Sequence, residues 1–467
     1  MSELCFKPAT ELSSLLHSRQ LGAVELLSTY MEQIDRLNPV VNAIVTLTRE
    51  QAFESAKQAD CKKNKGLLHG LPIGVKDNLR TRGIRTTWGS SLYKDYIPEF
   101  DDLIVERHQA AGAIMVGKTN LPELSYGGQT TNSLFGSTLN PYDSSKTCSG
   151  SSGGGASALA CGMLALADGS DVAGSLRSPA AWCNVVGFRP SPGRIPKLNG
   201  NARFDEINVH GPMARTVADI ALFMRAVAGP DARSSLSIEQ ELVNASEDLR
   251  VDHKNTRIAW SPDLGFAQVD PEVADVFSES FDVFASLSCD ITETSPQVMG
   301  ASETLLTLKT MIMKEEIDAA LARGKADDLS PLLEAGQARA NRLSAIEITH
   351  AKAQRAALGH RVSECLELYE FLVWPTHFMK PYAIDDPEAE SAMNWIALDV
   401  APLLGLPAIT VPGGFTPDGL PVGLQIMGRR DHDWDVLRLA WAFEQETGVW
   451  KHRPPSSDLG ASPPEPD

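Results

Sequence analysis

Short apolar runs alternate with segments of helical spacing along most of this chain, and this alternation restricts its fold more than any other feature. Apolar runs bounded by Gly, Pro, Asn or polar residues predict strands at 70–78, 113–119, 256–260, 370–375, 407–412 and 421–428. Helical spacing predicts helices at 9–22, 101–112 and from 23 up to Pro39, which should end the last of them. Strands that alternate with helices indicate an α/β fold with a parallel or mixed sheet.

The last two predicted strands are joined by the sequence TPDGLP at 416–421, which is typical of a hairpin. A hairpin pairs antiparallel strands, so we expect a mixed sheet flanked by helices. The sequence has no internal repeat and no long linker. We therefore expect one large domain over residues 1–452.

Two parts of the chain differ from the rest in composition. Residues 230–370 are more polar and more helical, and an apolar stripe there is predicted to face the core: Leu305, Leu308, Ile312 and Ala319. Residues 453–467 are rich in Pro, Ser and acidic residues, a composition that predicts disorder.

Charge and cysteine content exclude some classes of function. The formal net charge of −18 argues against nucleic acid and anionic membrane surfaces as partners, because both bind Lys and Arg. The uncharged stretch 147–167 begins with Ser and Gly and is a poor membrane span. The N-terminus lacks the pattern of a signal peptide, and the seven cysteines form no CxxC pair. We expect reduced thiols in a cytoplasmic protein.

The segment Ser149–Gly155 contains only serine and glycine, and three interpretations of it are open. A flexible linker is disfavoured, because a strand-like segment precedes it and a buried helix follows. A phosphate-binding loop would need a lysine after Gly155, where Ala156 stands. A nucleophile elbow, G-x-S-x-G, would be centred on Ser152.

A second loop of small residues favours a different chemistry. Residues 168–179 are predicted to form a loop centred on Ser175, and Lys76 is predicted at the end of a strand. Two serines on two such loops and one lysine can serve as nucleophile, proton relay and base. A buried lysine can act as a base because burial lowers its pKa. The small residues before Ser175 would let main-chain N–H groups point at one oxyanion.

The chain resembles the amidase signature hydrolases, which use a Ser–cisSer–Lys triad. The resemblance runs nearly from end to end and is carried by six blocks: 68–78, 110–143, 150–160, 169–194, 405–430 and 442–448. It implies an amidase signature fold, Ser175 as the nucleophile, Ser151 as the cis-serine and Lys76 as the base. It also implies a cis peptide bond between Gly150 and Ser151, and an oxyanion hole made by the amides of Val172, Ala173, Gly174 and Ser175.

Some positions depart from the family pattern. Ser149 and Ala173 stand where the family usually has glycine, and a methyl group at Ala173 restricts the φ angle there. The sequence FRPSPGR at 188–194 replaces the commoner LKPTxGR. These departures leave the subfamily open and do not change the predicted chemistry.

Other polar residues near these motifs have simpler predicted roles. We expect Ser152 to cap a helix or to support the site, Asp171 to hold its loop, and Arg177 to form a buried ion pair. Cys148, Cys161 and Cys183 are expected to be small buried hydrophobic residues, and His69 and His210 to lie in loops.

The resemblance implies no metal and no organic cofactor. The expected substrate is a small amide, ester or carbamate, including urethanes, and the expected assembly is a monomer or homodimer. Two alternatives remain: the ammonia-generating glutaminase component of an amidotransferase, and a non-catalytic binding module with the same fold.

Overall fold

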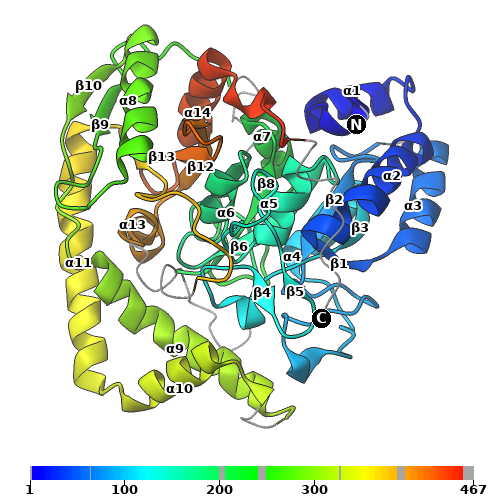
Figure 1. Ribbon diagram of the computed structural model, residues 1–467, viewed down its shortest axis with the longest axis horizontal. Helices are drawn as coiled ribbons and strands as arrows, with labels where there is room; N and C mark the ends of the chain where they lie inside the picture. The colour runs from blue at the N-terminus through cyan, green and yellow to red at the C-terminus, as the bar shows by residue number, and fades with distance from the viewer. Residues whose placement is uncertain are drawn as a thin grey trace.

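The six predicted apolar runs are strands of one mixed sheet, which has eleven strands in all (Figure 1). The computed structural model describes residues 3–63, 65–198, 206–239, 249–324, 328–386 and 395–455. In spatial order the strands are β1 (Ile44–Leu47), β3 (Ile114–Thr119), β2 (Pro72–Lys76), β6 (Leu166–Asp171), β8 (Val209–Ala214), β7 (Val186–Arg189), β12 (Ala408–Phe415), β13 (Pro421–Met427), β11 (Phe371–Pro375), β9 (Arg257–Trp260) and β10 (Asp290–Glu293). A separate small ribbon pairs β4 (Thr131–Asn132) with β5 (Gly136–Ser137).

The sheet is mixed, as the sequence predicts. Strand β2 is parallel to β3 and β6, and β9 is parallel to β10 and β11. The predicted hairpin is β12–β13, an antiparallel pair in which Thr410 lies opposite Gln425. Its turn includes Gly419 at φ +81°, a backbone conformation that glycine adopts without steric cost.

The helices are α1 (Ala9–His17), α2 (Ala23–Val41), α3 (Arg49–Cys61), α4 (Leu103–Ala110), α5 (Gly153–Ala160), α6 (Arg177–Trp182), α7 (Val217–Val227), α8 (Pro271–Ser286), α9 (Ala301–Leu321), α10 (Pro331–Arg342), α11 (Ala345–Leu368), α13 (Ile396–Leu404) and α14 (Asp433–Thr447). Helices α4, α7, α14 and α8 pack on one another in that order, and α5 and α6 contact each other and the central strands. Helices α9, α10 and α11 border the molecule at the lower left of Figure 1.

Helix α2 continues past Pro39, which was expected to end it. It runs to Val41 and ends at Asn42, which adopts the left-handed conformation at φ 51° and donates its N–H to the carbonyl of Asn38 at 2.8 Å. Pro39 lies in the last turn, where the helix loses few hydrogen bonds to the missing N–H.

The apolar stripe on α9 is only partly as predicted. Leu305 is buried, but Ala319 is exposed, and the C-terminal half instead buries Ile317 and Ala320. The buried face changes because the helix has different partners along its length. Leu305 belongs to a cluster with residues of α13, whereas Ile317 packs with Leu333 of α10.

A strand that was not predicted, β6, lies between the two small-residue segments. Residues 168–171, predicted as part of a loop, form the end of β6 between β2 and β8. Small residues are needed in this strand because neighbouring side chains leave little space beside it. A Cβ at Gly169 would lie 2.6 Å from the hydroxyl oxygen of Ser152.

Most of the predicted tail, residues 456–467, lies outside the described residues, while Arg453 pairs with Glu3 at 2.7 Å. None of the helices in the described ranges is long and apolar enough to cross a membrane. All seven cysteines are free.

Candidate active site

Lys76 lies at the end of β2, inside the sheet, and is fully buried. Its ammonium nitrogen Nζ is 2.7 Å from the hydroxyl oxygen of Ser151 and 3.0 Å from that of Ser170. Burial lowers the pKa of Lys76 to about 7, while the negative charges of Asp171 and Asp168 act in the opposite direction. A lysine with this pKa is partly neutral near neutral pH and can accept a proton.

Ser151 belongs to a buried loop that leads into α5, and the Gly150–Ser151 peptide bond is cis, as the resemblance predicts. The glycines after it pack directly on polypeptide backbone and side chains. A Cβ at Gly153 would lie 2.3 Å from Thr130 Oγ1, and one at Gly154 would lie 2.3 Å from the main-chain nitrogen of Asn120. The Ser/Gly segment is therefore a packed part of the core, which excludes the linker interpretation.

Ser175 lies in the turn just before α6 and is partly exposed. Its main-chain carbonyl accepts the N–H of Ser152 at 3.1 Å, which brings the two small-residue loops together. Within the described ranges the Ser175 hydroxyl makes no hydrogen bond, whereas Ser151 contacts Lys76 directly. The structure thus joins Lys76 to Ser151 through side chains, and it joins Ser175 to the adjacent Ser152 through the main chain.

Asp171 organises the loop that carries Ser175. Its fully buried carboxylate accepts the N–H groups of Gly174 at 2.9 Å and Leu176 at 3.3 Å, and pairs with Arg177 at 3.0 Å and Arg189 at 3.2 Å. Although burial acts to raise the pKa of Asp171, the two guanidinium groups hold it well below its usual range. Asp171 therefore stays charged and holds the loop.

Arg177 forms a buried ion pair, as predicted from the sequence. In addition to Asp171, it donates to the side chain of Gln425 at 2.6 Å and to the main-chain carbonyl of Leu398 at 2.9 Å. These contacts tie the start of α6 to β13 and α13.

The four amides expected to form an oxyanion hole are not equivalent. The N–H of Gly174 is engaged by Asp171, and Gly174 has φ +96° with Leu398 so close that a Cβ would lie 2.8 Å from it. Ala173 has a negative φ, so its methyl group causes no backbone strain. In the described part of the chain, the N–H groups of Ala173 and Ser175 donate to no protein acceptor.

Ser152 precedes α5 and is fully buried, with its hydroxyl oxygen 3.5 Å from the main-chain carbonyl of Ser170. A nucleophile must be reached by substrate, so this position argues against a nucleophile elbow centred on Ser152. Its location fits the expected supporting role.

Two further residues near Lys76 were not singled out by the sequence. Asn78 donates its side-chain amide to Ser170 and to Ser125, both at 3.0 Å, and Ser170 is also hydrogen-bonded to Lys76. The available signal was position: Asn78 follows Lys76 by two residues, and Ser170 lies next to Asp171. Such contacts depend on which strands are neighbours.

The cysteines and histidines near the site are unsuited to the chemistry. Burial raises the pKa values of Cys148 and Cys161 to about 12 and that of Cys183 well above its usual value. His69 precedes β2 in a turn, but His210 lies in β8 and not in a loop. Burial, and then nearby cations, lower the pKa of His210 to about 3.

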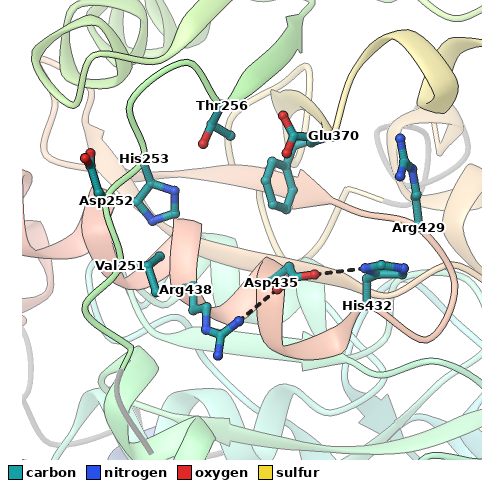
Figure 2. Close-up of a pocket in the computed structure, with 10 residues that line it drawn as sticks. Val251, Asp252, His253, Thr256, Glu370, Arg429, His432, Asp435 and Arg438 are labelled. Atoms are coloured by element: carbon teal, nitrogen blue, oxygen red, sulfur yellow. Dashed lines mark hydrogen bonds and ion pairs between the residues drawn. The ribbon is translucent and has the colours of Figure 1, made fainter. Parts of the chain in front are cut away.

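A surface cavity of about 320 Å³ lies elsewhere, between the loop before β9, the start of β11 and the first turns of α14. It is lined by Val251, Asp252, His253, Thr256, Glu370, Phe371, Arg429, His432, Asp435 and Arg438. Figure 2 shows Asp435 hydrogen-bonded to both His432 and Arg438. These polar side chains of the cavity wall therefore pair with one another. None of the predicted site residues lines it. No group of side chains in the described ranges has the arrangement of a metal site.

Comparison with known proteins identifies the family of the chain. The family model described as Amidase matches residues 25–437. The chain is 37% identical to the acylamidase of Rhodococcus erythropolis over 97% of both proteins. It is also 32% identical to one component of the glutamyl-tRNA(Gln) amidotransferase of Thermosynechococcus vestitus, over 95% of this chain and 98% of that protein.

Solved structures match the fold along its whole length. A bacterial aryl acylamidase of the amidase signature family superposes with a TM-score of 0.90 at 24% identity, covering 99% of this chain and 100% of the other. The 6-aminohexanoate cyclic dimer hydrolase superposes with a TM-score of 0.89 at 25% identity, covering 98% and 100%. Because the family model matches most of this chain, the chain belongs to the amidase signature family.

Proposed function

We propose that this protein is an amidase that cleaves a C–N amide bond through an acyl-enzyme, with Ser175 as nucleophile, Ser151 as proton relay and Lys76 as base. The observation that carries the proposal is the contact of 2.7 Å between the buried Lys76 amine and the Ser151 hydroxyl. The similarity to an acylamidase along nearly the whole chain supports an amide as substrate.

In the proposed acylation, the neutral Lys76 amine takes the proton of Ser151 as Ser151 takes the proton of Ser175. The oxygen of Ser175 forms a bond to the substrate carbonyl carbon, and the carbonyl electrons move to its oxygen. When they return, the C–N bond breaks, and the departing amine receives the proton back through Ser151. Water then repeats the cycle on the acyl-enzyme and releases the acid.

The oxyanion formed in this step needs preorganised donors. We propose that the amides of Val172, Ala173 and Ser175 supply them, because the Gly174 N–H already donates to Asp171. Asp171, Arg177 and Ser152 support the site without touching the reacting atoms. Fixing these dipoles before the reaction avoids their reorganisation during it.

The substrate class is a small amide. Relatives and structural neighbours are named acylamidase, aryl acylamidase and 6-aminohexanoate cyclic dimer hydrolase. These names favour an N-acylated amine, that is, a non-peptide amide, as the substrate of this protein. Esters should react by the same steps, since an alkoxide leaves more easily than an unprotonated amide anion. Carbamates are candidates because they offer a similar carbonyl carbon to Ser175.

A second candidate is the glutaminase component of an amidotransferase, since several relatives at 30–33% identity are named as components of such an enzyme. Such a component would release ammonia from glutamine and deliver it to a partner. A non-catalytic binding module is the third candidate and would form no acyl-enzyme.

Hydrolysis of an acyl anilide by the purified chain distinguishes these candidates. The amidase proposal predicts steady release of aniline by the wild-type chain alone, its loss in Ser175→Ala, and little release of ammonia from glutamine. Turnover of glutamine without turnover of anilides would favour the glutaminase component. A well-folded wild-type chain that turns over none of these and gains no acyl adduct would support the binding module.

A further inference from the structure

Strands β2 and β6 separate just before Lys76. Their parallel pairing includes Ile73 with Leu166 and Gly74 with Ala167, and it ends there. Beyond this point the main-chain N–H of Lys76 donates to a side chain, the carboxylate oxygen Oδ1 of Asp168, at 2.8 Å. The Asp168 carboxylate thus replaces a main-chain acceptor where the ladder opens.

The second oxygen of Asp168 faces helix α4. Oδ2 lies 3.4 Å from the ring nitrogen Nε2 of His108, and both side chains are fully buried. Among the described residues, neither of these two atoms has a hydrogen-bond partner within bonding geometry. His108 shares its helix with the buried apolar residues Leu103, Ile104 and Val105. A buried carboxylate is costly, and apolar side chains of similar volume often pack at least as stably, so stability alone does not account for it.

We propose that Asp168 is a positioning residue for Lys76: its carboxylate fixes the main chain at the open end of the ladder and supplies a negative charge that acts on the amine. The inference rests on the proposed role of Lys76 as the base. Because Lys76 projects from this point toward Ser151, a shift of its main chain would change the 2.7 Å contact.

The charge of Asp168 acts together with several other groups. Lys76 is faced by Asp168 and Asp171 on β6, Glu316 on α9 and His210 on β8. Asp168 is itself faced by Lys118 on β3 and His108 on α4. The negative charge of Asp168 raises the pKa of Lys76 against the larger effect of burial. Removing that charge should therefore lower the pKa of Lys76.

Two substitutions at Asp168 separate charge from geometry. Asp168→Asn keeps an oxygen that accepts the Lys76 N–H and adds an N–H toward His108, but it removes the charge. We expect its kcat/KM for an anilide to reach a plateau within about threefold of wild type, with the rising limb of the pH profile about one unit lower. Asp168→Ala also removes the acceptor, and its plateau should fall about tenfold or more.

A matched control is Asp219→Asn. Asp219 is equally buried and accepts a main-chain N–H, that of Thr10, at the same distance of 2.8 Å, but it is not among the groups that act on Lys76. This variant should keep the wild-type limb and plateau. A merely structural role for Asp168 would lower Tm in Asp168→Asn without moving the limb.

The outcomes separate this inference from the proposed function. If Asp168→Asn folds and keeps the wild-type limb while Lys76→Ala is inactive, the positioning role is wrong and the function stands. If Lys76→Ala keeps the wild-type rate and profile on the anilide, the proposed function fails. If Asp168→Ala does not fold, the position of the rising limb in the pH profile of Asp168→Asn still tests the positioning role.

Discussion

At the scale of single residues, the unusual group is Lys76, a buried lysine whose amine forms no ion pair with a carboxylate. The Lys76 amine contacts two hydroxyl groups, those of Ser151 and Ser170, and its nearest carboxylates act from a distance. Burial therefore dominates and moves the pKa from 10.5 to about 7. An exposed lysine would be almost fully protonated at neutral pH and unable to act as a base.

The first prediction is the pH profile. The base form of Lys76 is the neutral one, so kcat/KM for an anilide should rise about tenfold per pH unit below pH 7 and level off above it. Rates between pH 5 and 9 in buffers of constant ionic strength measure this. A rising limb that continues to the ordinary pKa of an exposed lysine would show that Lys76 is protonated at neutral pH.

The second prediction compares leaving groups. Lys76→Ala should reduce hydrolysis of an anilide much more, by about a hundredfold or more, than hydrolysis of the matching nitrophenyl ester. A departing amine must be protonated through Ser151, whereas nitrophenoxide leaves unaided. Ser151→Ala is the companion variant and should show the same bias. Equal losses on both substrates would mean that Lys76 has a structural role and does not transfer protons.

At the scale of elements, the positions of the loops depend on close packing of glycine. Gly154 and Gly155 are neighbours in the first turn of α5, yet a Cβ at Gly154 would lie 2.3 Å from the main chain of Asn120, and one at Gly155 would lie 3.4 Å from Ala167. Only the first contact requires the backbone to move. The same substitution to alanine should thus destabilise the protein at Gly154 and not at Gly155.

The third prediction tests this pair. Gly154→Ala should destabilise the protein by about 1–3 kcal/mol or more through overpacking. Gly155→Ala should be neutral or should stabilise by up to about 1 kcal/mol, because alanine favours helix. Chemical denaturation of both variants measures the difference. A similar loss of stability in both would contradict the packing account of the Ser/Gly segment.

The strands were predictable because apolar runs bounded by turn residues are a local signal. The ends of β2, β3, β9 and β11 lie within two residues of the predicted ends. Strand β6 was not predicted, because residues 166–167 belong to a segment expected to be a buried helix and small residues such as Gly169 and Ser170 normally indicate loops. There the neighbouring strands, and not the sequence of β6, determine the conformation.

The residues of the site also divide into those with a local sequence signal and those whose roles depend on neighbouring strands. Lys76, Ser151 and Ser175 were predicted from motifs that resemble a known family, and the contact of Lys76 with Ser151 agrees. The roles of Ser170, Asn78 and Asp168 were not predicted, since each depends on the alignment of β2 with β6. A single sequence carries no direct record of that alignment.

At the scale of the whole molecule, the central sheet collects the site from distant parts of the chain. Lys76 comes from β2, Ser151 from the loop before α5, and Ser175 from the loop after β6, while Gln425 of β13 holds Arg177. Strands β2 and β6 are paired although about ninety residues separate them, and this pairing brings Lys76 close to the strand that leads to the Ser175 loop. The site therefore depends on the integrity of the domain.

The fourth prediction concerns reagents that act on the whole protein. Activity on an anilide should persist in EDTA, because no proposed step uses a metal. It should also persist after thiol blocking, since Cys148, Cys161 and Cys183 are fully buried. Initial rates before and after each treatment measure this. Loss of activity in EDTA that a divalent ion restores would contradict the mechanism.

The central claim is that Ser175 carries the acyl group. Treatment of the wild-type protein with a fluorophosphonate probe, followed by peptide mapping, tests it most directly, with Ser175→Ala and Ser152→Ala as matched variants. We expect one adduct per chain on Ser175, its absence in Ser175→Ala, and its retention in Ser152→Ala. An adduct on Ser152 that persists in Ser175→Ala would contradict the account and favour a nucleophile elbow.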